Sequence, residues 1–202
     1  MNIAIIDSGI HPGHPHVGEV AGGIGIVSAD YLDNLGHGTA VAGAIREKVP
    51  DASLYAVKVF DRRLSASLDT ILRALEWCIA HQMDVINLSL GTANPSHREQ
   101  FERVLTAASL IVSAADFLPG NLPGVIGAAP EETCPRELFR YRDGIFYASP
   151  YPRSIPGVPV ERNLHGASFA VANMTGFVAR ALAGSPRDAI RPALIARATN
   201  IP

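Results

Sequence analysis

The sequence contains only two cysteines among its 202 residues, Cys78 and Cys134, and they lie far apart. Two distant cysteines provide neither a disulfide framework nor the spacing of a zinc site, so we expect free thiols and a reducing compartment. The N-terminus lacks a basic segment followed by an apolar core, and no run of about eighteen apolar residues occurs. These absences predict a cytoplasmic chain that does not span a membrane.

Concentrated positive charge is also missing. The formal net charge is −2, and lysine and arginine form no long run, which argues against nucleic acid or a membrane surface as a partner. At 202 residues and 48% hydrophobic, the chain is long enough for one complete core and short for two. We therefore expect one domain over residues 1–202.

Strand-like and helix-like segments alternate along the chain. Short apolar runs typical of buried strands cover residues 3–6, 22–27, 53–60, 83–90, 110–112 and 124–128. Segments with the composition or period of helices cover residues 37–45, 68–81, 96–107, 168–182 and 186–199. This alternation predicts an α/β fold with a mainly parallel sheet, helices on both faces and right-handed crossovers. Residues 131–162 are predicted to be irregular, with 144–148 as their only strand.

Three polar residues occupy positions that often carry function. Asp7 follows a buried strand, and the carboxyl ends of strands bear functional groups in open α/β sheets. His37 and Ser168 each follow small residues at the predicted start of a helix. Amide groups and the positive end of the helix dipole at such a position stabilise negative charge developing beside a hydroxyl. Taken alone, Ser168 is equally consistent with a simple N-cap.

A nucleophilic serine needs an imidazole to accept its proton and an acid to orient that imidazole. None of the seven histidines follows Ser168, which excludes the Ser, acid, His order of α/β-hydrolases. Their Gly-x-Ser-x-Gly motif is also absent, because Ala170 fills its last position. Asp7, His37 and Ser168 instead follow the Asp, His, Ser order of subtilisin.

Three stretches, residues 5–9, 36–43 and 166–170, resemble the catalytic blocks of the subtilisin-like serine proteases and occur in the same order. Residues 54–59 and 84–91 are similar to the segments between those blocks, and the resemblance extends from Asn2 to about Ala183. It implies a three-layer α/β sandwich and a serine endopeptidase that acts on peptide or protein substrates. It implies neither a cofactor nor a metal.

The resemblance also implies a role for each of the three residues. Asp7 orients the ring, His37 is the general base and then the acid, and Ser168 forms an acyl-enzyme. The substrate-binding residues that it implies are Phe60, Arg62 and Leu64 along an edge that pairs with an extended substrate, Ser89, Leu90 and Gly91 beside the first specificity pocket, and Ala114 and Ala115 after the next strand. The charge on Arg62 either favours acidic substrate side chains or is solvated surface charge.

The oxyanion hole is where the sequence departs from the family. The family uses an asparagine in an Ala-Ala-Gly-Asn-like turn, whereas residues 112–117 read Val-Ser-Ala-Ala-Asp-Phe. Asp116 is the nearest equivalent, Asn121 lies further on, Phe117 can donate only through its backbone, and Ala167 replaces the usual threonine. The Ser168 amide would remain as a donor. Because losing one donor costs about 10²–10³ in turnover, we expect a slow enzyme.

A carboxylate at Asp116 repels an oxyanion unless it carries a proton. Activity that depends on a protonated Asp116 should rise toward acidic pH until His37 itself becomes protonated, and Asp116→Asn should speed turnover. Asp7 lies too near the N-terminus for an inhibitory pro-segment of the usual kind. Asp-rich calcium loops are not recognisable, so a chelator should not change the thermal melting of the protein.

Slow chemistry without a pro-segment favours a selective protease, for example one that processes a precursor peptide. One alternative is a peptide-binding module that keeps the fold but is catalytically impaired. Another is metal-dependent hydrolysis through His11, His14 and His16. Prolines interrupt these three histidines, so they are predicted to lie in a loop, and no carboxylate or cysteine at a familiar metal-site spacing accompanies them.

Overall fold

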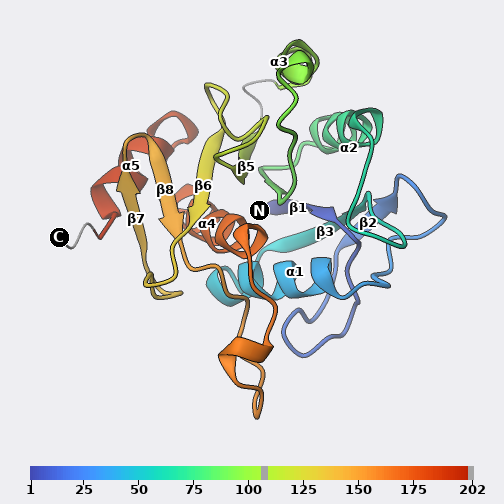
Figure 1. Ribbon diagram of the computed structural model, residues 1–202, viewed down its shortest axis with the longest axis horizontal. Coiled ribbons are helices and arrows are strands. Elements are labelled where there is room, and N and C mark those ends of the chain that lie inside the picture. The colour runs from blue at the N-terminus through green and yellow to red at the C-terminus, as the bar shows by residue number, and fades with distance from the viewer. Residues whose placement is uncertain (106–108, 200–202) are drawn as a thin grey trace.

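The computed structural model describes residues 1–105 and 109–199, and its strands form one eight-stranded sheet (Figure 1). The strands are β1 (Asn2–Asp7), β2 (Gly22–Gly25), β3 (Ser53–Lys58), β4 (Val85–Leu88), β5 (Leu110–Ala114), β6 (Ile126–Pro130), β7 (Phe139–Arg142) and β8 (Ile145–Ala148). Their order across the sheet is β2-β3-β1-β4-β5-β6-β8-β7. All neighbours pair in parallel except β7 and β8, which are antiparallel. The carboxyl ends of the parallel strands therefore share one edge of the sheet.

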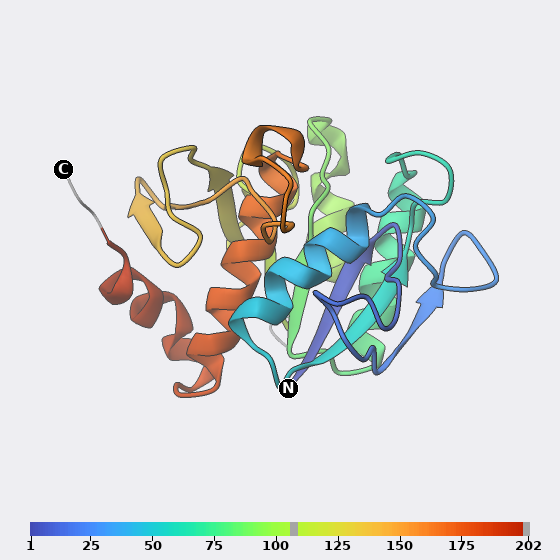
Figure 2. The same ribbon diagram turned by 90° about the horizontal axis from the view of Figure 1, so that it is seen from below.

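Helices cover both faces of this sheet (Figures 1 and 2). The α-helices of the described residues are α1 (His37–Lys48), α2 (Leu68–Ala80), α3 (Arg98–Val104), α4 (Ala167–Leu182) and α5 (Ile190–Arg197), with 3₁₀ turns at Pro95–His97, Val160–Arg162 and Arg187–Ala189. Residues of α1, α4 and α5 belong to the hydrophobic cluster on one face, and residues of α2 and α3 to the cluster on the other. The predicted α/β fold with a mainly parallel sheet between two helical layers is confirmed.

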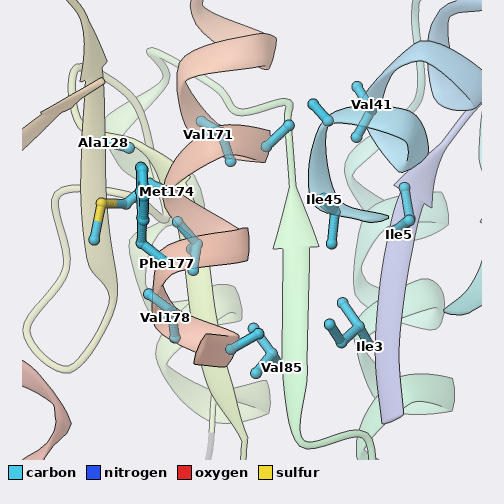
Figure 3. Close-up of a cluster of buried hydrophobic side chains, with 14 of the residues drawn as sticks. Ile3, Ile5, Val41, Ile45, Val85, Ala128, Val171, Met174, Phe177 and Val178 are labelled. Carbon is cyan, nitrogen blue, oxygen red and sulfur yellow. The ribbon is translucent and has the colours of Figure 1, made fainter. Parts of the chain in front are cut away.

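Strand β1 shows how alternating side chains divide the core between the two faces. Ile3 and Ile5 face α1 and α4, whereas Ala4 and Ile6 face α2 and α3, and all four are fully buried. Figure 3 shows the first cluster, in which side chains of α1 and α4 pack with those of β1, β4 and β6. Burial on both faces explains the continuous apolar run of this strand. Each buried isoleucine contributes roughly 1.5–3 kcal/mol to the stability of the fold.

The contact between α1 and α4 fixes the two helices that begin at His37 and near Ser168. Lys48 of α1 is buried at this contact, and its Nζ donates to Asn173 Oδ1 of α4 at 2.6 Å. Burial disfavours the charged amine and lowers the pKa of Lys48 to about 8. A Cβ on Gly176 of α4 would lie only 2.6 Å from Lys48 Cδ, so this glycine allows the close approach. The end of α1 is thereby held against the middle of α4.

Strand β7 makes the prediction of a single strand within residues 131–162 wrong. Asp143 and Gly144 have φ angles of 51° and 85°, as in the two-residue turns that join hairpin strands. Phe139 of β7 also packs on Phe177 of α4, with 4.8 Å between the ring centroids. The Asp-Gly turn and this buried aromatic contact explain why a segment rich in proline and arginine still adds a strand.

Two predicted helices are shorter than expected. The helix predicted at residues 96–107 begins at Arg98, after a 3₁₀ turn, and its last described residue is Val104; residues 106–108 lie outside the described residues. Proline at position 95 favours a turn start here, because its fixed φ suits the first helical position. The helix predicted at residues 186–199 is α5, preceded by another 3₁₀ turn, and it ends at Arg197. Ala198 is extended instead, and the amide of Thr199 donates to Phe139 O.

Candidate active site

Asp7 and His37 form a hydrogen-bonded pair at the carboxyl edge of the sheet. Asp7 ends β1 and is fully buried, while His37 begins α1 and has a side chain that is 14% exposed. His37 Nδ1 donates to Asp7 Oδ1 at 2.7 Å, and Ser8 N donates to the same oxygen at 2.8 Å. With Nδ1 carrying a proton, Nε2 of the neutral ring is the proton acceptor.

Asp33 determines where α1 begins. Its Oδ2 accepts from Thr39 N at 2.8 Å and from Thr39 Oγ1 at 2.6 Å. Its Oδ1 accepts from the amides of Leu35 and Gly36, both at 2.9 Å, and from Ser8 Oγ at 2.8 Å. The carboxylate therefore satisfies a free amide of the first turn and lies at the positive end of the helix. In exposed helices each of these two effects adds about 1 kcal/mol to stability.

Gly38 lets α1 approach the end of β1 closely. A Cβ at this position would lie 2.2 Å from Gly9 O, a distance that no side chain can accommodate. Gly38 N donates to Ser8 Oγ at 2.9 Å, which ties the first turn of the helix to the residue after Asp7. The glycine that follows His37 is thus a condition for the contact between the imidazole and Asp7.

The surroundings of His37 raise its pKa above the ordinary value of 6.5. Burial acts in the opposite direction because it disfavours the imidazolium, but the hydrogen bond to Asp7 and the negative charges of Asp7 and Asp33 outweigh it. Asp7 Oδ2 is buried and has no hydrogen-bond partner among the described residues. Buried carboxylate oxygens are rarely left unsatisfied, and functional sites are where such exceptions occur.

Ser168 is the second residue of α4, directly after Gly166 and Ala167. The first amides of a helix have no partner within the helix, so this end attracts negative charge. Ser168 Oγ donates to Ser89 O at 3.3 Å, and no hydrogen bond among the described residues joins it to His37. The ring of Phe169 packs against the imidazole with 5.4 Å between centroids. The serine segment and the Asp7–His37 pair therefore lie side by side.

The predicted substrate-binding segments at residues 89–91 and 114–115 lie next to each other. Ser89 and Leu90 are half-buried after β4, Gly91 is exposed, and Ala114 and Ala115 are buried at the end of β5. Just beyond them, the amides and carbonyls of residues 92 and 118 form a two-hydrogen-bond bridge at 2.9 and 3.0 Å. These segments are therefore neighbours in space, although 24 residues separate 90 and 114 in the sequence.

The predicted substrate-pairing edge divides into a buried and an exposed part. The side chain of Phe60 is buried in the cluster beneath α2 and α3, and its amide donates to Asp7 O at 3.3 Å. Arg62 is 95% exposed and lies 3.9 Å from Asp61, while Leu64 is 54% exposed. The structure thus places Phe60 where it supports the edge, and Arg62 and Leu64 where solvent or a ligand contacts them.

The turn predicted to supply oxyanion donors lies at the surface. Asp116, Phe117 and Asn121 are all exposed. Phe117 N donates to Ala114 O at 3.2 Å, and Asn121 N donates to Phe117 O at 3.1 Å. Among the described residues, no hydrogen bond connects Asp116 or Asn121 with Ser168.

The three histidines of the predicted loop do lie in a loop, between β1 and β2. His11 Nδ1 donates to Pro12 O, and His14 Nδ1 accepts from His16 N at 3.2 Å. Within residues 1–105 and 109–199, no three His, Cys, Asp or Glu side chains gather as a metal ion would require. The histidine loop thus provides no ready-made metal centre in the part of the chain that the structure describes.

Both cysteines, Cys78 and Cys134, are free and buried, as the sequence predicts. Burial raises the pKa of both thiols, which makes them unreactive at neutral pH. None of the described helices has the length and apolar character needed to cross a bilayer.

Sequence reasoning missed three residues that shape the site. Asp33 caps α1 and helps raise the pKa of His37, Phe169 packs on the imidazole, and Lys48 links α1 to α4. Only Asp33 had a readable signal, since an aspartate shortly before a predicted helix start is typical of a cap. A lysine at the end of α1 reads as a surface charge, and its burial depends on α4, which lies more than a hundred residues later.

The fold and the site together define a class of protein: an α/β chain in which a buried Asp–His pair at a strand end lies beside a serine at a helix N-terminus. The model of the subtilase family matches residues 1–122. The chain therefore belongs to the subtilase family.

Individual relatives are consistent with this assignment. The chain is 34% identical over 206 residues to a thermostable alkaline protease of Halalkalibacterium halodurans, covering 88% of this chain and 55% of that protein. It is 29% identical over 210 residues to subtilisin E of Bacillus subtilis, covering 92% and 54%. A shorter match, 43% over 107 residues, covers 48% of this chain and 16% of the minor extracellular protease Epr of Bacillus subtilis. The chain thus spans about half the length of the relatives that it matches from end to end.

A solved structure shares the fold. The crystal structure of a cold adapted subtilisin-like serine proteinase superposes with a TM-score of 0.76, covering 97% of this chain and 81% of that one, at 18% sequence identity. At this identity the likeness supports the fold, and the site must be argued from its own residues.

Proposed function

We propose that this chain is a serine endopeptidase in which Asp7, His37 and Ser168 form the catalytic triad. The observation that carries the proposal is the 2.7 Å hydrogen bond between His37 Nδ1 and buried Asp7, which leaves Nε2 as a proton acceptor beside the serine segment. Membership of the subtilase family supports a serine protease function. The resemblance of residues 166–170 to the family's serine block supports Ser168 as the nucleophile.

Catalysis begins when Ser168 Oγ exchanges its hydrogen bond to Ser89 O for one to His37 Nε2. Oγ then attacks the peptide carbonyl carbon while its proton moves to Nε2, and Asp7 stabilises the imidazolium. Cleavage of the C–N bond follows, and Nε2 returns the proton to the leaving amine. Water repeats the same proton transfers and releases the acyl group from Ser168, so the enzyme is regenerated unchanged.

We further propose that this chemistry is slow and selective. The Ser168 amide and the N-terminus of α4 can stabilise an oxyanion, whereas the exposed Asp116 brings negative charge to the turn where relatives of this family carry a donor. A slow protease without a second strong donor suits one or a few peptide substrates, such as a precursor that requires a single cut. A purified chain that cleaves general peptides but leaves such precursors uncut would contradict the selective role.

A fluorophosphonate probe tests the nucleophile directly, because it reacts with an activated serine whatever the peptide specificity. We expect labelling of Ser168 in the wild-type chain, and loss of labelling in both Ser168→Ala and His37→Ala. His81→Ala is the matched histidine control, since His81 lies at the end of α2, stacked on Trp77. Absence of labelling between pH 5 and pH 9 in a folded chain would support the catalytically impaired peptide-binding module instead. The hydrogen bond between Ser168 Oγ and Ser89 O is the observation that favours that alternative.

A further inference from the structure

A pocket of about 280 Å³ lies beside the candidate active site and has no part in the mechanism above. Four of the side chains that line it are nitrogen bases, namely His11, His14, His16 and Arg153. Exposed Ile155 and Leu164 form apolar parts of its wall. Three imidazoles and a guanidinium therefore surround one small cavity.

The acidic side chains at this pocket already have hydrogen-bond or ion-pair partners. Asp33 lines the pocket, and its two oxygens accept five hydrogen bonds, from Ser8, from the amides of residues 35 and 36, and twice from Thr39. Glu47 lies nearby and pairs with Arg136, and Arg153 Nε lies 3.8 Å from Glu47 Oε1. What the pocket presents to a ligand is therefore basic nitrogen, with apolar walls that suit the carbon chain of a longer side chain.

The pocket lies on the opposite side of the sheet from two of the predicted substrate-binding residues, Phe60 and Leu90. Phe60 belongs to the cluster on the α2–α3 face of the sheet, and Leu90 packs against the same cluster. The pocket is formed instead by the loop after β1, the start of α1 and residues 152–164, all of which lie on the α1 side of the sheet in Figure 1. A substrate that crosses the Asp7–His37 pair from one face to the other places its leaving segment at the pocket.

From this arrangement we propose that the pocket formed by His11, His14, His16 and Arg153 binds a carboxylate of the substrate segment that leaves after cleavage. This inference rests on the proposed function. It assigns acidic specificity to the histidine loop rather than to the exposed Arg62. The pocket lining includes Gly36, next to His37, and Leu164, four residues before Ser168. Because the pocket is this close to the proposed triad, the carboxylate that it binds should belong to one of the first few residues after the scissile bond.

The histidines make this recognition dependent on pH. Burial, together with the positive charges of Arg153, His14 and Arg136, lowers the pKa of His16, and only Glu47 acts in the opposite direction. Protonation of His16 therefore adds positive charge to the pocket only on the acidic side of its ordinary range, while Arg153 remains charged throughout. Affinity for a carboxylate should be strongest at mildly acidic pH and should weaken, without vanishing, toward alkaline pH.

Matched peptides test the proposal. The peptides have amidated C-termini and carry Glu or Gln at one of the first three positions after the cleaved bond, one position at a time. Their kcat/KM values are compared at pH 6 and pH 8.5. At one position we expect a Glu preference of about fivefold or more at pH 6, the effect of roughly 1 kcal/mol from partly exposed ion pairs, and a smaller preference at pH 8.5. A parallel Gln peptide with a free C-terminus distinguishes a terminal carboxylate from an acidic side chain as the group that is bound.

Variants locate the effect. Arg153→Gln and His14→Gln should each reduce the preference for the carboxylate toward one, whereas His81→Gln should leave the preference and both rates unchanged. Dissociation constants of the same peptides measured on Ser168→Ala provide a second readout that does not require cleavage. Failure of fluorophosphonate labelling would contradict the proposed function alone. Equal affinity for acidic and neutral peptides at both pH values, or a preference that survives in both pocket variants, would overturn the pocket assignment.

Discussion

The region around Asp7 and His37 and the turn at residues 115–121 differ in what holds them in place. Around the pair, the Asp33 side chain accepts five hydrogen bonds and Gly38 has no room for a Cβ. In the turn, Asp116, Phe117 and Asn121 face solvent, backbone hydrogen bonds join residues within the turn and to residues 92 and 128, and Gly120 also has no room for a Cβ. Side-chain hydrogen bonds hold the first region, whereas backbone contacts hold the turn and leave these three side chains exposed.

This difference separates two parts of catalysis that are usually discussed together. In the proposed mechanism, proton transfer depends on the geometry between Asp7 and His37, which the sheet edge and the start of α1 fix. Stabilisation of the oxyanion would depend on donors that a surface turn presents, and such turns accept substitutions at little cost to folding. A chain of this family can therefore keep its proton-transfer groups while its rate is set by what occupies the turn.

The largest effect is expected from Asp7→Asn, which removes the carboxylate that accepts the hydrogen bond from His37. An amide at this position cannot stabilise the imidazolium and favours the wrong tautomer of His37, so kcat should fall by about 10⁴ near neutral pH. Steady-state cleavage of a fluorogenic peptide measures the loss, and circular dichroism checks that the chain remains folded. Asp188→Asn, in the 3₁₀ turn before α5, is the matched control and should keep the wild-type rate. A folded Asp7→Asn chain that retains full activity would remove the carboxylate from the mechanism.

The second-largest effect on kcat, an increase, is expected from Asp116→Asn in the turn at residues 115–121. A neutral donor in place of a carboxylate should raise kcat, by at most about 10²–10³, the contribution of one oxyanion donor. Asp116→Ala separates the two causes, because it removes the charge without adding a donor and should give only part of the gain. If wild-type turnover uses a protonated Asp116, its increase toward acidic pH should disappear in the Asn variant. A slower Asp116→Asn enzyme would exclude this turn as the oxyanion site.

The smallest effect is expected from Asp33→Asn, which weakens the first region without removing a catalytic group. The negative charge of Asp33 helps raise the pKa of His37, so its loss should lower that pKa and move the acidic limb of the kcat/KM profile to lower pH. Because His37 acts as a base, the variant should be relatively more active than wild type on that limb. Its free energy of unfolding should fall by about 1–2 kcal/mol, since an engaged cap is weakened.

The pH dependence of stability gives an independent check on Asp33. A raised pKa means that protonated His37 stabilises the folded state: this contribution is complete below 6.5 and is lost as the pH rises through the folded-state pKa. Asp33→Asn should therefore lose more stability at pH 5 than at pH 8. Chemical denaturation at the two pH values measures this, and an equal loss at both would indicate that Asp33 acts only as a cap.

The sequence by itself determined the alternation of strands and helices, the order of Asp7, His37 and Ser168, and the positions of the last two at helix starts. These features are local, because apolar runs, small residues and chain order can be read within a short window. The hairpin at β7 was missed although its Asp-Gly turn was visible, since the surrounding prolines and arginines masked a strand that is stabilised by packing on α4.

Only the tertiary structure decided which side chains meet. The contact of Lys48 with Asn173, the bridge between residues 92 and 118, and the pocket between the histidine loop and residues 152–164 each join segments that are distant in the chain. Such contacts depend on how the helices pack on the sheet, a property of the whole core that no single window of sequence contains. The histidine loop therefore read as a solvated turn or a metal ligand set, and became a candidate carboxylate pocket only when Arg153 was placed beside it.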